Sequence, residues 1–406
     1  MISRRAANRL RQGYLWVYAS DIESIVPPRP GDTVLPVADD RGLLLGTAIY
    51  SPRSQIALRL VSREAVDEPA WLELFAVRLR RAIARRKPLL SAENDAGRLC
   101  FSEADELPGL IVDKYGALIV VQRLTQGLLG NAVADACVRV LREEIVPAAI
   151  LERPDPRIRE IEGLPAPAAA PLWAPDPAAP STSAQFHLHG LVFHYDADAG
   201  QKTGAFLDQR LNYAAARDWA RRLGVAKANG GRALDVCCYQ GGFALHLAQV
   251  CRYVTGIDTS HASLEVAELN LAANREQLAA SEVGWVEGDA FTILRDWSGA
   301  GQRFDAIVLD PPAFAKTRRA VESALRGYKE LNLRAIKMAS PGGLLVTCSC
   351  SHHVGWSDFE GAVASAAADA RRRVRLLERR GAAYDHPVIL NLPETEYLKC
   401  LVLEVE

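Results

Sequence analysis

Residues 233–243 read ALDVCCYQGGF, an apolar run followed by two glycines. The apolar run predicts a buried strand, and the glycines predict a tight turn into a helix. Glycine lets a ligand approach the backbone closely, and the start of a helix offers unpaired N–H groups. The glycines do not form the G-x-G-x-x-G pattern, so dinucleotide binding by a dehydrogenase is disfavoured. A tight turn that binds no ligand is the alternative.

The chain beyond this turn alternates between predicted strands and helices. We expect strands at 232–237, 253–258, 283–287, 304–309 and 343–348, with helical segments between them. This alternation predicts an α/β fold with a parallel, doubly wound sheet, which binds ligands at the carboxyl ends of its strands. A further strand at 397–403 closes the sheet, in a direction that could be antiparallel.

Two smaller domains are predicted before this sheet. Residues 1–67 contain short apolar runs separated by turn residues, which predicts a small β-rich domain. Residues 68–185 mix helical and strand patterns and predict a central α/β domain. The proline-rich stretch 164–182 predicts an exposed loop, because proline fits neither a helix interior nor a central strand. A hairpin at 186–199 then begins the third domain, 186–406.

The overall composition is that of an ordinary globular protein. The 406 residues carry 48 Lys and Arg against 49 Asp and Glu, a formal net charge of -1. The strongly basic field of many nucleic-acid binders is therefore absent, and positive charge is local, at residues 4–11 and 78–87. No apolar run is long enough for a membrane span, and no secretory signal is recognised. Eight scattered cysteines favour reduced thiols, so we expect a cytoplasmic protein.

Three acids stand in or just after three successive predicted strands. Asp235 lies in the first strand, and Asp258 ends the second, where a carboxylate suits the two hydroxyls of a ribose. Asp289 follows the third strand and could hold an adenine amino group. Dehydrogenases and methyltransferases both use such a ribose contact, so the contact does not distinguish between these two enzyme classes. Each acid alone could be a solvated loop residue, but three in series indicate a nucleoside-containing ligand.

Two further segments follow predicted strands and carry reactive groups. Residues 310–314 read DPPAF, in which two prolines stiffen the strand exit and present Asp310 to a flat base edge. Residues 347–353 read TCSCSHH. Cys348 and Cys350 share one face of a strand, and Cys350 lies nearer the carboxyl end, where a thiolate can act as a nucleophile. A buried packing thiol and a zinc site are the alternatives, but no second ligand pair has zinc spacing, so no metal is expected.

A third segment, residues 200–210, reads GQKTGAFLDQR and precedes the sheet. Lys202 or Arg210 could meet a cofactor carboxylate or an RNA phosphate. A solvated charged loop is the alternative.

Together these segments resemble the RlmI-type class I S-adenosylmethionine-dependent methyltransferases, which modify cytosine C5 in 23S ribosomal RNA. The resemblance rests on residues 201–210, 234–243, 310–314, 327–332, 349–351, 385–387 and 397–399, and on 13–18, which resembles the start of a PUA domain. It covers almost the whole chain. It implies an N-terminal PUA RNA-binding domain, a central α/β domain and a C-terminal Rossmann-like methyltransferase domain, with free 23S rRNA or a large-subunit precursor as partner. A homodimer is one expected assembly.

The resemblance also implies roles for single residues. Cys350 would add to C6 of the base as nucleophile, and Asp310 would hold its N3/N4 edge. The S-adenosylmethionine contacts would come from Arg210, Asp235, Tyr239, Gly241, Asp258, Asp289 and Asp310. The RNA or its base would contact Lys202, Phe314, Tyr328 and Arg9. Core packing is the alternative for the two aromatic rings.

Some positions depart from the family pattern. Cys237 and Gln240 stand where the family often has Phe and Thr, and residues 352–354 read HHV, as in a sister subgroup. Ala313 takes the place of the second cysteine of related two-cysteine enzymes, which implies a single-cysteine mechanism with Cys348 as the competing nucleophile. Two other functions stay open. One is methylation of an exocyclic amino group, which needs no thiol. The other is a non-catalytic RNA-binding ribosome-assembly factor.

Overall fold

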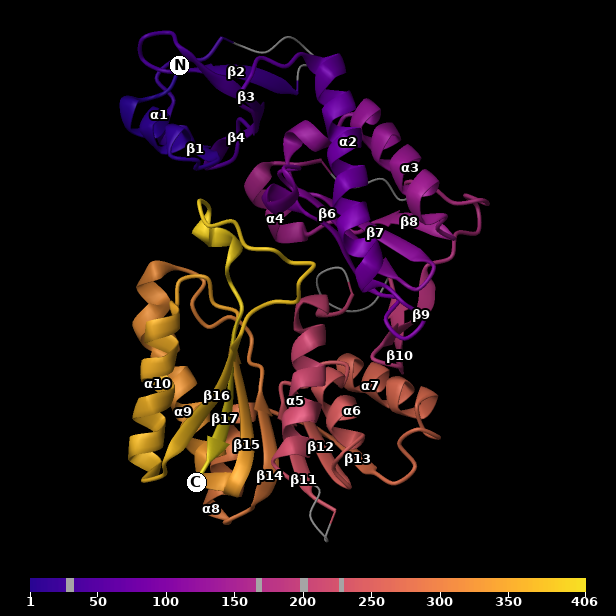
Figure 1. The fold of residues 1–406 in the computed structure, drawn as a ribbon, viewed down its shortest axis with the longest axis vertical. Coiled ribbons are helices and arrows are strands. Elements are labelled where there is room, and N and C mark those ends of the chain that lie inside the picture. Colours follow the sequence, from indigo (N-terminus) through magenta and orange to yellow (C-terminus); the bar gives the residue numbers. More distant parts are fainter. Residues whose placement is uncertain (27–32, 166–169, 198–203, 226–229) are drawn as a thin grey trace. The chain divides into compact units, whose positions relative to one another are not determined.

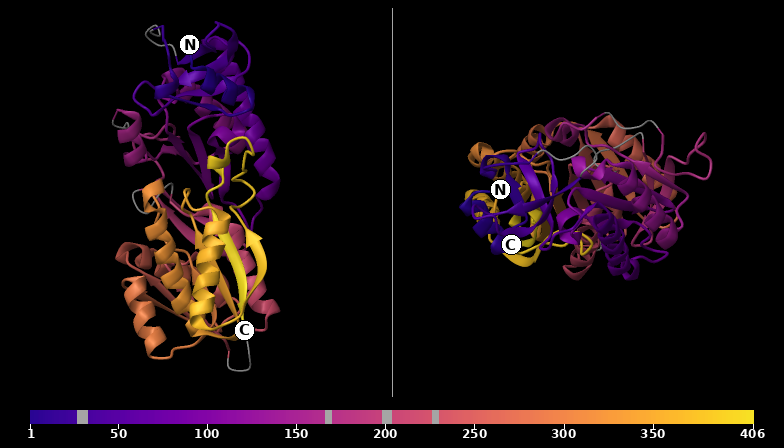
Figure 2. Two further views of the ribbon diagram at one scale, coloured as in Figure 1. Left: turned by 90° about the vertical axis from the view of Figure 1, so that its left-hand side faces the viewer. Right: turned by 90° about the horizontal axis from the view of Figure 1, so that it is seen from above.

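A computed structural model describes residues 1–26, 33–165, 170–197, 204–225 and 230–406. The chain forms two compact units, and Figures 1 and 2 show its course through them. The N-terminal unit comprises Met1–His187, Tyr195–Ala205 and Tyr384–Thr395. The C-terminal unit comprises Leu188–His194, Phe206–Ala383 and Glu396–Glu406. No helix within the described ranges is long and apolar enough to cross a membrane.

The N-terminal unit begins with a helix and a small antiparallel sheet. The sheet has the order β1-β4-β3-β2, with strands β1 (Trp16–Tyr18), β2 (Val34–Ala38), β3 (Leu44–Tyr50) and β4 (Ile56–Ser62). The helix α1 (Arg4–Arg11) was not predicted. Ser3 caps it by accepting a hydrogen bond from the Ala6 N–H at 3.3 Å, and Leu10 is buried in the core of the sheet.

The N-terminal unit continues with a second sheet, of order β5-β6-β7-β8. Its strands are β5 (Gly97–Phe101), β6 (Leu110–Tyr115), β7 (Leu118–Arg123) and β8 (Ala149–Glu152), and its helices are α2 (Glu68–Arg86), α3 (Asn131–Ile145) and α4 (Pro156–Glu162). Asp67 caps α2 by accepting from the Ala70 N–H, and the apolar face of the helix buries Trp71 and Phe75 against the sheet. Of the proline-rich loop, the described part pairs with β8 through a bridge between Trp173 and Ile150.

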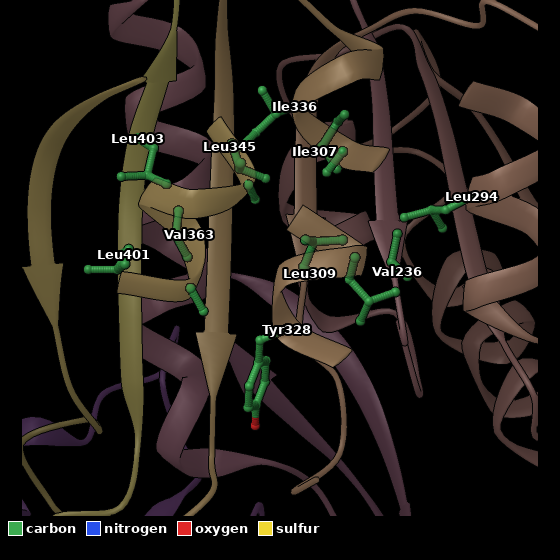
Figure 3. Close-up of a cluster of buried hydrophobic side chains, with 14 of the residues drawn as sticks. Val236, Leu294, Ile307, Leu309, Tyr328, Ile336, Leu345, Val363, Leu401 and Leu403 are labelled. Carbon is green, nitrogen blue, oxygen red and sulfur yellow. The ribbon is translucent and has the colours of Figure 1, made fainter. Parts of the chain in front are cut away.

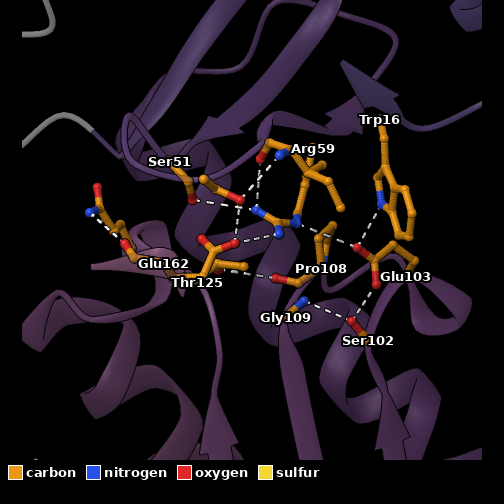
Figure 4. Close-up of polar contacts among 12 residues, drawn as sticks. Trp16, Ser51, Arg59, Ser102, Glu103, Pro108, Gly109, Thr125 and Glu162 are labelled. Atoms are coloured by element: carbon orange, nitrogen blue, oxygen red, sulfur yellow. Dashed lines mark hydrogen bonds and ion pairs between the residues drawn. The ribbon is translucent and has the colours of Figure 1, made fainter. Parts of the chain in front are cut away.

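A buried ion-pair cluster joins the first sheet of this unit to two helical elements (Figure 4). Arg59 of β4 lies 2.8 Å from Glu162 of α4 and 3.7 Å from Glu103. Trp16 of β1 donates its indole N–H to Glu103 at 2.9 Å. Because Glu162 ends α4 and Glu103 lies in the 3-10 helix Ser102–Asp105, the buried cluster links β1 and β4 of the first sheet to these two elements.

The C-terminal unit is built on a seven-stranded sheet of order β13-β12-β11-β14-β15-β17-β16. The strands are β11 (Arg232–Val236), β12 (Tyr253–Asp258), β13 (Glu282–Glu287), β14 (Phe304–Leu309), β15 (Ala339–Ser349), β16 (Val374–Arg380) and β17 (Lys399–Val405). The five strands from β13 to β15 in this order run parallel to one another, which confirms the predicted doubly wound sheet. β17 runs antiparallel, and β16, which was not predicted, pairs with its other edge.

Helices follow most of the strands of this sheet. They are α5 (Arg210–Arg222), α6 (Gly242–Ala248), α7 (His261–Ala273), α8 (Ala290–Gly299), α9 (Val321–Met338) and α10 (Trp356–Ala370). Side chains of α8, α9 and α10 form one buried cluster with the strands, in which Leu309 and Leu345 meet Ile336 and Val363 (Figure 3). The hairpin β9 (Ser183–Leu188) and β10 (Leu191–Asp196) precedes this sheet. The core therefore holds the strands rigidly and leaves their carboxyl ends to carry polar groups.

Candidate functional site

The turn after β11 has an unusual backbone. Cys237 and Tyr239 have φ values of 64° and 50°, in the left-handed region that few residues other than glycine adopt. Gly241, at φ 83°, stands just before α6, and a Cβ placed there would lie 2.9 Å from the ring of Trp285. The turn therefore needs a glycine at this position. Its conformation is held by the Cys238 N–H, which donates to the Ile257 carbonyl at 2.9 Å.

Asp235 and Asp258 lie on either side of this turn. Asp258, at the end of β12, is half-buried and accepts hydrogen bonds from the N–H groups of Tyr239 at 2.8 Å and Ser260 at 2.9 Å. Asp235 is fully buried and accepts from the Ala244 N–H at 2.8 Å, so it holds the start of α6. Burial raises its pKa well above the usual range. Its Oδ1 has no hydrogen-bond partner in the described part of the chain.

The next two acids differ from each other in exposure. Asp289 is exposed and caps α8, since it accepts from both the N–H and the hydroxyl of Thr292 at 2.8 Å. Asp310 is half-buried at the end of β14, and its own N–H donates to the Val236 carbonyl at 3.1 Å. The four predicted acids therefore lie at one edge of the sheet, around the glycine turn. Acceptor groups and an unpartnered buried oxygen at that edge fit a cationic cofactor that carries a ribose.

Gln209 positions Asp310, and sequence reasoning missed it. Its Nε2 donates to Oδ1 of Asp310 at 2.9 Å, and its Oε1 accepts from Asn212 at 2.6 Å. Gln209 ends the short 3-10 helix Leu207–Gln209, just before α5, and is buried. The predicted residue Arg210 follows it and is also buried, whereas Lys202 lies outside the described residues.

The two cysteines of β15 have different surroundings. Cys348 is fully buried opposite Cys400 of β17, and burial, together with a hydrogen bond to Cys400, raises its pKa well above the usual range. Cys350 follows the strand, is half-buried, and its Sγ lies 3.9 Å from the carbonyl oxygen of Pro311. Cys350 thus lies beside the Asp-Pro-Pro segment, and its role as the nucleophile stays a prediction.

The aromatic side chains near Cys350 belong largely to the core. Tyr328 of α9 is 1% exposed, and its hydroxyl is 2.9 Å from both the Ser349 and the Ser351 hydroxyl oxygens. The half-buried ring of Phe314 packs on it with centroids 4.8 Å apart. Tyr328 is therefore part of the packed core, which is the alternative considered above. Stacking of either ring on a base stays a prediction.

A buried lysine is the second residue that sequence reasoning missed as a site residue. Lys399 begins β17 and donates from Nζ to the Ser351 carbonyl oxygen at 3.0 Å. The sequence offered two signals, a lysine in front of an apolar strand and its place in the segment 397–399, which was used only for the family resemblance. Among the residues that the structure describes, no cluster of three or more His, Cys, Asp or Glu side chains could hold a metal ion.

The predicted RNA-contacting residue Arg9 lies on α1 in the N-terminal unit. It forms an ion pair with Asp21, and its guanidinium stands over the rings of Tyr14 and Tyr18, 5.6 and 5.4 Å from their centroids. The charge of Arg9 is thus compensated by Asp21, and its contact with RNA stays a prediction.

Comparison with protein families matches two parts of the chain. Residues 1–63 match the model of a PUA-like domain, and residues 167–389 match that of an S-adenosylmethionine-dependent methyltransferase. The chain is also similar over nearly its full length to curated proteins named ribosomal RNA large subunit methyltransferase I. That of Shewanella denitrificans is 37% identical, over 98% of this chain and 96% of the relative. That of Erwinia tasmaniensis is 35% identical, over 98% and 97%.

Solved structures share the fold. A crystal structure of the methyltransferase SMU.776 in complex with SAH has a TM-score of 0.79 at 20% identity, and covers 100% of this chain and 99% of its own. A methyltransferase from Streptococcus mutans has a TM-score of 0.77 at 19% identity, with full coverage of both chains. At these identities the likeness concerns the fold alone.

Proposed function

This chain belongs to the S-adenosylmethionine-dependent methyltransferase family, and we propose that it methylates C5 of a cytosine in large-subunit ribosomal RNA. The name of its relatives and the PUA-like match at residues 1–63 support an RNA substrate. The observation that carries the reaction is the half-buried thiol of Cys350 beside the Asp310-Pro311 segment. In this proposal the predicted domain 1–67 binds RNA, the predicted domain 186–406 performs the transfer, and the enzyme acts in the cytoplasm.

Cytosine C5 is too weak a nucleophile to accept a methyl group unaided. When bound, S-adenosylmethionine supplies an electrophilic methyl group on a sulfonium. The Cys350 thiolate would form an Sγ–C6 bond, which moves electron density to C5 and N3. C5 then forms its bond to the methyl carbon as the sulfonium–methyl bond breaks. A base takes the C5 proton, and the Sγ–C6 bond breaks to release the thiolate and 5-methylcytosine.

Asp310 would hold the base during these steps. Its side chain is directed by the Gln209 amide, which leaves it little freedom to rotate. A carboxyl group at the cytosine edge can accept from the N4 amino group through one oxygen and, through the proton on the other, donate to N3 and stabilise the negative charge that develops there. This contact requires a base that is unstacked or single-stranded.

Cofactor contacts are assigned to the same edge of the sheet. Asp258 is the acceptor for the ribose hydroxyls, because it ends β12 with its carboxylate fixed by two N–H groups. Tyr239 and Gly241 would line the turn, and Asp289 would meet the adenine amino group. Buried Asp235 and Arg210 would support this edge. A homodimer remains part of the prediction for the assembly.

Trapping with a fluorinated base tests this function. The full-length protein is incubated with S-adenosylmethionine and ribosomal RNA that contains 5-fluorocytosine, which blocks release because fluorine cannot leave as a proton does. We expect an adduct that maps to Cys350, lost in Cys350→Ala and kept in the matched variant Cys348→Ala. Methyl transfer that persists in Cys350→Ala would instead indicate an exocyclic amino group as target. Absence of S-adenosylmethionine binding by calorimetry would indicate a non-catalytic RNA-binding factor.

A further inference from the structure

Lys399 lies against both residues that flank Cys350. It is paired in register with Ser349 across β15 and β17. Its Nζ donates to the carbonyl oxygen of Ser351 at 3.0 Å. The ammonium group is therefore held beside the backbone on either side of the proposed nucleophile. All of these residues belong to the C-terminal unit.

This ammonium group is buried without the partner that a buried lysine usually has. Lys399 is 3% exposed, and lysine is rarely buried to this extent unless an anion compensates its charge. In the described ranges its only hydrogen bond goes to a neutral carbonyl, and it forms no ion pair with a carboxylate. Glu396 interacts with it electrostatically but is hydrogen-bonded to the indole of Trp356. Among the described residues, the buried ammonium group thus has no hydrogen-bonded anion to compensate its charge.

The charged and titratable groups around Cys350 come from several elements. Lys399 of β17 is the cation, Tyr328 of α9 is a neutral hydroxyl, and Asp310, after β14, and Glu396 are carboxylates. Burial lowers the pKa of Lys399, while the negative charges of Glu396 and Cys350 raise it. Coulomb attraction is mutual, so an ammonium that a thiolate stabilises also stabilises that thiolate.

We infer that Lys399 is a positioning residue whose ammonium charge keeps Cys350 in its reactive thiolate form. The inference rests on the proposed function, since it names the group that activates the proposed nucleophile. The thiol proton passes to solvent as the thiolate forms, and the ammonium keeps its own protons. Tyr328 has a different role, because its hydroxyl fixes Ser349 and Ser351 without adding charge.

The pH dependence of alkylation measures this role without RNA or cofactor. Iodoacetamide reacts with the thiolate, whose Sγ displaces iodide, and mass spectrometry gives the rate at Cys350 separately from other thiols. For Lys399→Met we expect the midpoint of the rate profile to rise by about one pH unit, and the rate at pH 7.5 to fall about 10-fold. Lys399→Arg, which keeps the charge, is expected to retain most of the wild-type rate.

Tyr328→Phe is the matched control, since it perturbs the same backbone segment without removing a charge. Its midpoint is expected to equal that of the wild type. Calorimetric binding of S-adenosylmethionine shows that each variant is folded, and Lys399→Gln replaces Lys399→Met if the latter does not fold. A wild-type midpoint in the folded neutral variant would overturn the role of Lys399. The fluorocytosine experiment tests the proposed function and the alkylation profile tests Lys399. A negative result in one therefore does not decide the other.

Discussion

The side-chain amide of Gln209 donates a hydrogen bond of 2.9 Å to Oδ1 of Asp310, which ties the segment before α5 to the carboxyl end of β14. The amide is itself fixed, because its oxygen accepts from Asn212 at 2.6 Å. The direction of the Asp310 carboxyl group thus depends on a residue from a different part of the chain.

Replacing Gln209 by Leu is expected to slow methyl transfer. The substitution keeps the side-chain volume but removes the hydrogen bond from Gln209 to Asp310, a loss of about 1–3 kcal/mol or roughly 10- to 100-fold in kcat. Methyl incorporation into RNA gives kcat and KM separately. Gln277→Leu is the control, because Gln277 is exposed and its amide donates to the Gly190 carbonyl oxygen, away from Asp310. Equal kcat in both variants would contradict the positioning of Asp310 by Gln209.

Replacing Asp258 by Ala is expected to weaken S-adenosylmethionine binding. The change removes the proposed ribose acceptor and the anchor for the N–H groups of Tyr239 and Ser260. Hydrogen bonds to a charged group contribute about 1.5–3 kcal/mol, so the Kd should rise roughly 10- to 100-fold by calorimetry. Asp369→Ala, which removes an exposed acid paired with Lys329, should leave it unchanged. An unaltered Kd in Asp258→Ala would exclude the ribose contact.

A histidine pair, of which His246 is buried and His189 half-buried, is expected to make the C-terminal unit sensitive to acid. His189 and His246 lie 3.2 Å apart, and His246 Nδ1 is 2.7 Å from the Gly242 carbonyl oxygen. Burial lowers the pKa of His189 to about 4 and that of His246 to about 3. Both pKa values are depressed, so the stability they contribute is present above about pH 6.5 and is lost as pH falls toward 4.

At pH 5 this loss amounts to about 2 kcal/mol for each imidazole, because the unfolded chain is protonated there and the folded chain is not. Urea unfolding followed by circular dichroism at pH 7.5 and 5 measures it. His246→Leu should reduce the difference between the two pH values, whereas His353→Gln, at an exposed position, should not. The same difference in all three proteins would refute this prediction.

The ion-pair cluster of the N-terminal unit is expected to be essential for its stability. Glu162→Gln removes the carboxylate that pairs with Arg59 at 2.8 Å and leaves a buried charge poorly compensated. Breaking such a pair typically costs about 3–5 kcal/mol in the free energy of unfolding. Glu160→Gln on the same helix is the control, since Glu160 is exposed. Urea midpoints that agree between the two variants would show that the cluster contributes little.

The alternation of strands and helices was enough to predict the sheet of the C-terminal unit. Buried parallel strands such as β12 and β14 form continuous apolar runs, which stand out in a sequence. β16 was missed because it reads VRLLERR, and its charges hide the strand pattern at the sheet edge. α1 was missed because four arginines over eight residues were interpreted only as local charge.

The sequence predicted a candidate site residue only where the residues next to it in the chain also define its structural position. Asp258 and Cys350 lie at strand ends, and strand ends can be recognised locally. Gln209 and Lys399 act through contacts with segments that are far away in the chain, at separations of 101 and 48 residues. Nothing in their immediate neighbours encodes those contacts, because the register of β17 against β15 is decided by the folded sheet.

The insertion of β17 between β15 and β16 has a consequence for biosynthesis. A ribosome makes β15 and β16 first, so the two strands wait with unpaired facing edges until β17 leaves the exit tunnel. A nascent chain interrupted before residue 399 lacks the strand that joins them and also the ammonium proposed to activate Cys350. The proposed activation of Cys350 therefore requires that β17 has been synthesised, and products truncated before residue 399 would have an unactivated thiol and unpaired strand edges that favour aggregation.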